Sequence, residues 1–250
     1  MRRLLAPALS VLMLAQGAAP VLAAGFDDQQ KQEIRGIVKD YLVQHPEVIL
    51  EAIQALQARQ DAEQANEAKG KIADLRDKLL RDSRDQVIGN PKGDVTLVEF
   101  FDYRCGYCKQ AQPIVMELIK ADPKLRVVLK EFPILGPDSL VASRAALASV
   151  AQGKYAAFHE ALIASRGALP DDKIMEIAKT VGIDTEKLKA DMSSPAIAAQ
   201  IADAHSLAEK LAINGTPSFI IGDQLIPGAI DLEALKKLVS DARSACAGTC

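Results

Sequence analysis

The stretch 97-LVEFFDYRCGYCKQAQP-113 places two cysteines, two residues apart, directly after an apolar run. The run 95-VTLVEFF-101 is rich in β-branched and aromatic residues, which predicts a buried strand. Residues 106–120 have a helical pattern of apolar positions. Cys105 and Cys108 therefore stand where a strand is followed by the first turn of a helix.

This position suits a redox pair. The thiolate is the form of cysteine that attacks a disulfide, and a helix N-terminus favours it through free N–H groups and partial positive charge. We expect the pKa of Cys105 to fall for this reason. Cys108, one turn later, can resolve a mixed disulfide formed on Cys105.

The sequence gives less support to two other interpretations of the cysteine pair, a zinc site and a structural disulfide. A zinc site needs four ligands, which Cys246 and Cys250 would complete only by folding back. The three histidines, His45, His159 and His205, have no ligand spacing to the cysteines. An inert structural staple is the remaining alternative, and we predict neither a metal nor a cofactor.

The segments around this stretch predict an α/β fold. A second strand is expected at 125-LRVVLKEFP-133, and a hairpin at 217-PSFIIGD-223 and 224-QLIPG-228. Residues of about 138–210 have the pattern of several helices, and a last helix covers about 231–245. The order predicts one sheet with a helical insertion.

Residues 26–90 are different: they are polar, helical in pattern and poor in strand signals. The pair 45-HP-46 should interrupt the helix, because proline disfavours helix in the residue before it. Gly70 and 89-GNPKGD-94 are expected flexible points. The apolar positions form narrow stripes: Ile34, Ile37, Val38, Tyr41, Leu42, Ile49, Ala52, Ile53 and Leu56. Narrow stripes favour association between copies, while packing on the main domain and a solvated arm are the alternatives.

The first 24 residues are typical of a secretion signal. Arg2 and Arg3 precede an apolar stretch, and 21-VLAAG-25 offers a cleavage site. A retained membrane anchor is the alternative, although the apolar stretch is short for a span. We expect a bacterial periplasmic protein, in a compartment that permits disulfides. The net charge of −3 and the lack of a basic face argue against nucleic acid binding.

A second cysteine pair, Cys246 and Cys250, lies in 244-SACAGTC-250. A chain of 250 residues can bury a stable core without disulfides, so a disulfide between these two cysteines would need another reason. We favour a structural disulfide that tethers the tail. A thiol relay, a Cu(I) site and free thiols are the alternatives.

The motif in 97–113 resembles that of the DsbA-type thioredoxin-fold oxidoreductases. The stretch 215-GTPSFIIG-222 resembles the Thr-Pro loop of that fold, and the helical block between the two also matches. The resemblance implies that residues 91–250 form a thioredoxin fold, into which a helical segment of about residues 138–210 is inserted. The segment 25–90 resembles the ScsC branch of the family, in which such a segment is a helical trimerisation stalk.

The resemblance also implies roles for single residues. Cys105 would be the attacking thiol and Cys108 the resolving one. Pro217 resembles the family's cis-proline, and the backbone of Thr216 could pair with a substrate strand. Glu99 resembles the buried acid beneath the active site, which could accept the proton of the resolving thiol. Lys130 either pairs with this acid or is exposed.

One departure bears on the direction of the reaction. Gly106 and Tyr107 stand where the parent oxidase has Pro-His, so no histidine donates to the thiolate. A less stabilised thiolate makes the couple less oxidising, which favours disulfide isomerisation. The predicted protein is a homotrimer through residues 26–90 that acts on misfolded exported proteins and is reduced by a membrane partner of the ScsB or DsbD type. A monomeric oxidase served by a DsbB-type partner and a copper-binding thiol protein are the alternatives.

Overall fold

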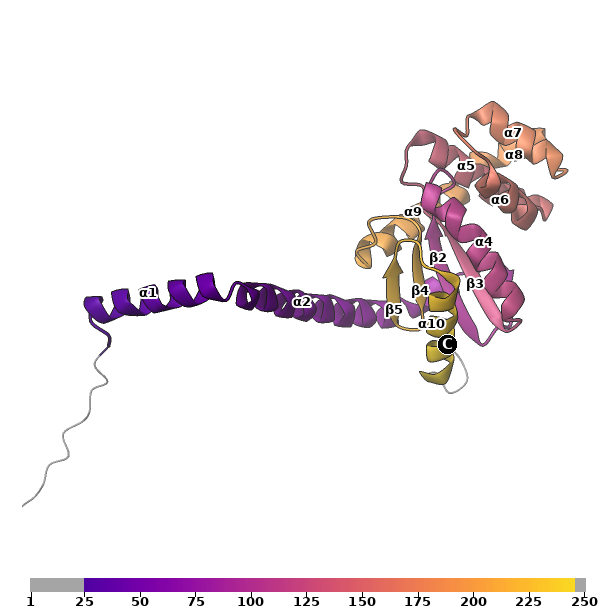
Figure 1. Ribbon diagram of the computed structural model, residues 1–250. Helices are drawn as coiled ribbons and strands as arrows, with labels where there is room; N and C mark the ends of the chain where they lie inside the picture. The colour runs from indigo at the N-terminus through magenta and orange to yellow at the C-terminus, as the bar shows by residue number, and fades with distance from the viewer. Residues whose placement is uncertain (1–24, 246–250) are drawn as a thin grey trace, which may run out of the picture. The chain divides into compact units, whose positions relative to one another are not determined.

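The computed structural model describes residues 25–245, and the chain divides into two compact units between Gln57 and Ala58 (Figure 1). The predicted signal segment 1–24 and the predicted tail disulfide between Cys246 and Cys250 lie outside the described residues. Within the described part, none of the helices combines the length and the apolar character that crossing a membrane needs.

Two helices open the described chain. Helix α1 (Asp28–Gln44) begins with a capping box, in which the Asp27 side chain accepts from the Gln30 N–H and the Gln30 side chain accepts from the Asp27 N–H. The helix ends before 45-HP-46, as the sequence predicts, and α2 (Glu47–Asp74) begins after it. The predicted interruption by proline is confirmed.

The apolar side chains of α1 and of the first part of α2 are exposed. No residue of α1 is buried, and Ile37 has 69% of its surface exposed. Farther along α2, Gly70 lies inside the helix and Ile72 is buried in the second unit. The exposed set is Phe26, Ile34, Ile37, Val38, Tyr41, Val43, Ile49, Leu50, Ile53 and Leu56.

The second unit contains a five-stranded mixed sheet in the order β1-β3-β2-β4-β5. β2 and β3 are parallel, and the other neighbouring pairs are antiparallel. The strands are β1 (Gln86–Gly89), β2 (Val95–Phe101), β3 (Leu125–Glu131), β4 (Ser218–Ile221) and β5 (Gln224–Pro227). The two predicted central strands and the hairpin are confirmed.

Strand β1 was not expected, because the sequence pattern of residues 26–90 predicts helices. The strand is four residues long and pairs with β3 at an edge of the sheet. Three of its residues are only partly buried, so the segment lacks the continuous apolar run of a central strand. A short edge strand of this kind leaves little pattern in a sequence.

Helices cover both faces of the sheet, and the two-residue period of the strands divides the core accordingly. On one face Leu97 and Phe101 of β2 pack in a cluster with α4 (Gly106–Ala121) and α10 (Leu232–Ala245). On the other face Val98 and Phe100 pack with Leu79 of α3 (Arg76–Leu80) and with Leu207 of α9 (Pro195–Lys210). Successive residues of β2 therefore belong to different cores.

The helical insertion lies between β3 and β4 in the sequence, and one of its helices, α6 (Tyr155–Ala164), packs against α4 (Figure 1). Its extent agrees with the predicted range of about 138–210. Its elements are α5 (Pro137–Ala148), the short 3₁₀ helix η1 (Ser149–Gln152), α6 (Tyr155–Ala164), α7 (Asp171–Thr180), α8 (Thr185–Met192) and α9.

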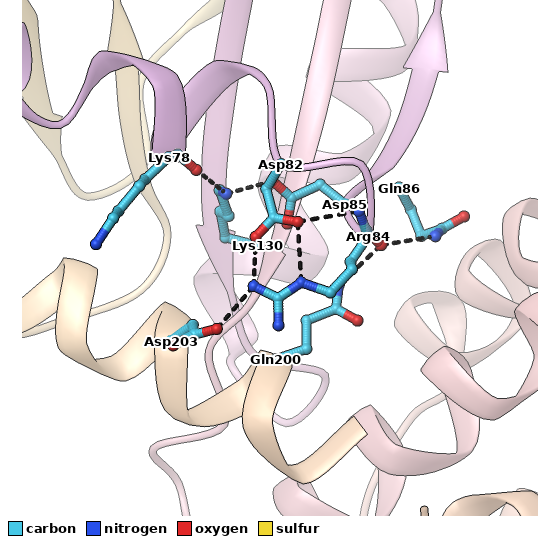
Figure 2. Close-up of polar contacts among 8 residues, drawn as sticks. All are labelled: Lys78, Asp82, Arg84, Asp85, Gln86, Lys130, Gln200 and Asp203. Carbon is cyan, nitrogen blue, oxygen red and sulfur yellow. Dashed lines mark hydrogen bonds and ion pairs between the residues drawn. The ribbon is translucent and has the colours of Figure 1, made fainter. Parts of the chain in front are cut away.

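A buried ion pair fastens the segment before β1 to the sheet (Figure 2). Lys130 of β3 has 2% of its side chain exposed and pairs with Asp85, which has 5% exposed. The same ammonium donates a hydrogen bond of 2.7 Å to the Lys78 carbonyl at the end of α3. Both partners come from residues that precede β1, so β3 holds this segment in place.

A more exposed group of contacts lies beside this pair (Figure 2). The Arg84 guanidinium donates to Asp82 at 2.5 Å and to Asp203 of α9 at 2.7 Å. The side-chain amide of Gln200 donates to the Arg84 carbonyl at 2.8 Å. These contacts join the same segment to the helix that covers this face of the sheet.

Candidate active site

The two cysteines lie at the start of α4, directly after β2. Cys105 is the N-cap residue, with an extended backbone, and its sulfur accepts a hydrogen bond from the Cys108 N–H at 3.4 Å. The Cys105 N–H donates to the Asp102 carbonyl at 3.1 Å, which closes the turn between strand and helix. The predicted position of Cys105 at a helix N-terminus is confirmed.

Hydrogen bonds at this position lower the pKa of Cys105 to about 5. The largest cause is the hydrogen bond from the Cys108 side chain. The Thr216 side chain and the backbone N–H groups of Cys108 and Tyr107 add to it, while burial opposes it. A thiol with this pKa is a thiolate at neutral pH.

The pKa of Cys108 is shifted in the opposite direction. Its hydrogen bond to the Cys105 thiolate raises its pKa, and burial raises it further. Cys108 has 1% of its surface exposed and Cys105 has 6%. At neutral pH the pair therefore holds one proton, and it lies on the more buried sulfur.

The loop before β4 lies against Cys105. The peptide bond between Thr216 and Pro217 is cis. The Cys105 sulfur lies 3.1 Å from the Thr216 carbonyl oxygen, to which the protonated thiol can donate. The structure thus brings together the two loops that the sequence motifs predict, although 111 residues separate Cys105 from Thr216.

Glu99 is buried beneath the cysteine pair, with 2% of its surface exposed. Its carboxyl belongs to the same face of β2 as Leu97 and Phe101, which face α4. Burial raises the pKa of Glu99 to about 8, and the negative charge of the Cys105 thiolate contributes to the shift. Its Oε2 atom has no hydrogen-bond partner among the described residues.

Lys130 neither pairs with Glu99 nor is exposed, so both predicted alternatives for it are wrong. The register places Lys130 opposite Phe100, whereas Glu99 lies opposite Leu129. Adjacent residues of a strand point to opposite faces, so the lysine and the acid lie on different sides of the sheet. The partner of Lys130 is Asp85.

A family model described as DSBA-like thioredoxin domain matches residues 96–240. The chain belongs to the DSBA-like thioredoxin family. A second model, described as copper resistance protein ScsC N-terminal domain, matches residues 30–63. The DSBA-like match covers the cysteine pair, the helical insertion and the sheet except for β1 and the first residue of β2. The ScsC match covers most of α1 and part of α2.

Similar proteins of known structure agree with this assignment. A thioredoxin-like oxidoreductase from Silicibacter pomeroyi DSS-3 is 49% identical, with a TM-score of 0.67 over 68% of this chain and 99% of the other. Proteus mirabilis ScsC in a transitional conformation is 30% identical, with a TM-score of 0.66 over 88% of this chain and 100% of the other.

A curated relative of a different kind is also similar. An Na(+)/H(+) antiporter NhaA of Salinispora arenicola is 32% identical over 168 residues, which are 66% of this chain. This chain spans about a quarter of the antiporter's length.

A buried acid next to the cysteines of this DSBA-like chain was not predicted. The Asp102 side chain is fully buried and accepts hydrogen bonds from Arg104, Ile134, Leu135 and Ser139. The signal that could have found it is an acidic residue directly after a buried strand and before Cys105.

A buried polar cluster on the helical insertion was missed as well. The hydroxyls of Tyr103 and Tyr155 donate to Glu131 at 3.0 and 2.8 Å, and Tyr103 also lies 3.0 Å from Nδ1 of His159. Burial raises the pKa of Glu131 to about 8 and lowers that of His159 to about 4. The cluster joins β3 to α6. Its members come from separate segments, and no local spacing links them.

In residues 25–245 the structure contains no group of three or more histidine, cysteine, aspartate or glutamate side chains arranged to hold a metal ion. Cys246 and Cys250 are outside this range. The chemistry that the described site offers is that of two sulfurs, one carboxylate and the backbone of the Thr216 loop.

Proposed function

We propose that this protein is a periplasmic thiol–disulfide oxidoreductase that acts as a disulfide isomerase on misfolded exported proteins. The observation that carries the proposal is the asymmetry of the cysteine pair. The pKa of Cys105 is lowered to about 5, while that of Cys108 is raised. One sulfur is therefore ready to attack a disulfide, and the other stays protonated until it is needed.

The proposed reaction begins with the Cys105 thiolate. It attacks one sulfur of a substrate disulfide, forms a mixed disulfide and releases the other substrate sulfur as a thiolate. That thiolate can attack another disulfide of the substrate, and a rearranged substrate leaves as Cys105 is regenerated, with no net change of redox state. Alternatively Cys108 attacks Cys105, which leaves the substrate with two thiols and the enzyme with a disulfide.

The interactions that raise the pKa of Cys108 explain why it stays protonated before the mixed disulfide forms. Its hydrogen bond to the Cys105 thiolate is the first cause of its raised pKa. A mixed disulfide removes that negative charge, so the pKa of Cys108 should fall at this step. We assign Glu99 as the acceptor of the released proton. The mixed disulfide also removes the Cys105 charge that helps to raise the pKa of Glu99, so more of this group is then the carboxylate that can accept a proton.

The substrate would lie along the Thr216 loop. In this proposal the backbone of Thr216, next to Pro217, pairs with an extended substrate segment as an added strand. The contact between Cys105 and the Thr216 carbonyl supports this position, since it places the loop against the attacking sulfur.

Assembly is part of the proposal. The exposed apolar side chains of α1 and α2 support association of residues 26–90 into a homotrimer, as does the ScsC N-terminal match. Several thiolates around one substrate would raise their effective concentration. An isomerase must be kept reduced, so we include a membrane thiol reductase of the ScsB or DsbD type as the partner.

The activity test compares two cysteine variants on a reduced, full-length protein. Refolding of a substrate with scrambled disulfides should be lost in Cys105→Ser and partly kept in Cys108→Ser, because rearrangement on Cys105 needs no resolving thiol. In a separate assay that starts from oxidised protein, the wild-type Cys105–Cys108 disulfide can oxidise a dithiol substrate, and this reaction should be lost in both variants. An oxidase would instead show fast dithiol oxidation and negligible refolding of scrambled substrate by the wild type.

The assembly test uses light scattering on the full-length mature protein. Ile37→Glu places a charge in the exposed apolar set and should convert the trimer to a monomer. Lys39→Glu changes a charge on the same helix outside that set and should leave the trimer intact. A wild-type monomer would remove the assembly from the proposal and favour the monomeric oxidase.

A further inference from the structure

Two lysines from different helices donate to neighbouring carbonyl groups in the loop after α6. The ammonium of Lys109, in α4, donates to the Ser165 carbonyl. The ammonium of Lys173, in α7, donates to the Arg166 carbonyl at 2.6 Å and to the Ala168 carbonyl at 3.3 Å. Because Ser165 and Arg166 are adjacent in the chain, this loop holds the two ammonium groups close to each other.

Lys109 also lies beside the attacking cysteine. Its N–H donates to the Cys105 carbonyl at 3.1 Å, in the first turn of α4. Residues four positions apart lie on the same face of a helix, so the Lys109 side chain leaves α4 on the side of Cys105. The two groups interact, because the negative charge of the Cys105 thiolate acts to raise the pKa of Lys109.

A third cation lies in the same place. Burial lowers the pKa of Lys109, and the positive charges of Lys173 and Arg104 lower it further. Arg104 is the residue before Cys105, and its guanidinium donates to the Leu135 carbonyl at 2.6 Å. We call Arg104, Lys109 and Lys173 the cationic rim. Its members come from three segments, which are the Cys105 turn, α4 and α7.

The contacts of the cationic rim leave its charge mostly uncompensated. The two lysines donate to carbonyls, which carry no net charge, and within residues 25–245 neither lysine is part of an ion pair. Asp138 lies 3.9 Å from Arg104, but both side chains are a third or more exposed, so water screens this pair. The oxygens of Asp102, which is near Lys109, accept from backbone N–H groups and a hydroxyl instead.

We propose that the cationic rim is a specificity site for substrate carboxylates, which binds acidic residues next to a substrate disulfide while Cys105 attacks the sulfur. The occupant is an acidic polypeptide segment, and charge complementarity with the rim supports this choice. The whole chain has a net charge of −3, which repels such a segment, so a preference for it has to come from the rim. The inference rests on the proposed function and adds the charge of the substrate that the site prefers.

The experiment measures the second-order rate constant with which the reduced, full-length protein reacts with a disulfide peptide. Three peptides of otherwise identical sequence carry Glu, Gln or Lys on both sides of the disulfide. At low salt we expect the rate constants to fall in this order, by about threefold at each step, as partly exposed charge pairs allow. The Glu-to-Lys ratio should approach one at about 0.5 M salt, where the screening length is roughly 4 Å.

Equal rate constants for the three peptides at low salt would overturn the proposal. A Glu-to-Lys ratio that does not change with salt would overturn it as well, because shape and not charge would then distinguish the peptides.

Variants of the cationic rim assign the preference to single residues. Lys109→Gln and Lys173→Gln each remove one charge and should lower the Glu-to-Lys ratio about threefold. Lys109→Arg keeps the charge and should keep the ratio. The matched control is Lys120→Gln, which makes the same change at an exposed lysine in the last turn of α4, about 16 Å along the helix from Lys109. It should leave the ratio unchanged.

Two outcomes of these variants contradict the proposal. If Lys109→Gln slowed the reaction with all three peptides equally, Lys109 would only support the loop after α6. If Lys120→Gln lowered the ratio as much as Lys109→Gln does, the preference would follow from net charge. The Lys173→Gln variant and the salt dependence of the wild type decide the question even if Lys109→Gln fails to fold.

The same assay separates this inference from the proposed function. Wild-type protein that reacts with none of the peptides would contradict the oxidoreductase itself. Wild-type protein that reacts with all three at the same rate would contradict the specificity of the cationic rim alone.

Discussion

Two buried carboxyl groups on opposite faces of the sheet are treated differently by their surroundings. Asp85, near the end of the segment that precedes β1, has the Lys130 ammonium as its partner. Glu99, on the face covered by α4, has a nearby thiolate and an oxygen with no hydrogen-bond partner in the described chain. The first acid lies beside a cation, which favours its ionisation, and the second lies beside a negative charge, which disfavours it.

The difference separates a structural use of a buried acid from a chemical one. Pairing with a cation favours the charged form of a carboxylate, so Lys130 opposes the effect of burial, which raises the pKa of Asp85. An unpaired acid destabilises the fold when ionised, but it can take and give a proton in the physiological range. Each face of this sheet shows one of the two arrangements.

The largest expected effect comes from breaking the pair on the structural face. Lys130→Met removes the cation and leaves Asp85 buried without its partner, which should lower the free energy of unfolding by about 3–5 kcal/mol. Urea unfolding followed by circular dichroism measures this loss. The variant Lys130→Met/Asp85→Leu should recover most of it, because neither charge remains buried.

If Lys130→Met alone cost less than about 1 kcal/mol, the pair would behave as a surface ion pair and the contrast with Glu99 would be lost.

An intermediate effect is expected from the unpaired acid, and it depends on pH. The pKa of Glu99 is raised to about 8 in the folded protein, against 4.5 for the unfolded group. The folded state therefore binds more protons between these values, and this group's contribution to stability falls as pH rises, by up to about 1.4 kcal/mol per pH unit. Glu99→Gln should remove this dependence and gain about 2–3 kcal/mol over wild type between pH 5 and pH 7.

The measurement is urea unfolding of reduced wild type and Glu99→Gln at several pH values. Cys105 has the opposite sign, because its lowered pKa adds stability as pH rises above about 5, so only the difference between the two proteins isolates Glu99. Glu131, whose pKa is also raised to about 8, stays in both proteins. A difference that does not vary with pH would mean that Glu99 is not an unpaired buried acid.

The effect of Glu99→Gln on the reaction rates is a second measurement. In single-turnover reactions Glu99→Gln should slow the attack of Cys108 on a mixed disulfide and change the attack of Cys105 much less. Equal slowing of both steps would argue against Glu99 as the proton acceptor.

The smallest expected effect is at the exposed contacts beside Lys130. Arg84→Ala should cost less than about 1 kcal/mol, because exposed ion pairs are screened by water and salt. The Arg84 side chain lowers the pKa of Asp82 to about 2, so a carboxyl titration of the variant should show that pKa rising toward its usual value. A loss as large as that of Lys130→Met would mean that the two groups act as one network.

The sequence was sufficient to predict the elements with a continuous apolar pattern. β2, β3, the hairpin and the position of Cys105 are all local features of this kind. The burial of Glu99 was also predictable, because its neighbours in 97-LVEFF-101 are apolar on both sides.

The unpredicted features depend on contacts between distant segments. The face of the sheet to which Lys130 points follows from the register, and its partner Asp85 lies 45 residues away in a segment without a clear strand signal. Three of the four donors to Asp102 come from residues 32 to 37 positions farther along the chain. A pattern along the sequence does not encode such pairings.

The antiparallel pairing of β1 with β3 limits where the N-terminal helices can be exchanged for those of another protein. A gene fusion that replaced everything before residue 90 would uncover the edge of β3 and leave Lys130 without its counter-ion. A seam placed farther upstream, in the exposed part of α2 before Ile72, would keep the whole sheet. Evolution and protein engineers alike can exchange the leading helices of this chain only at such a seam.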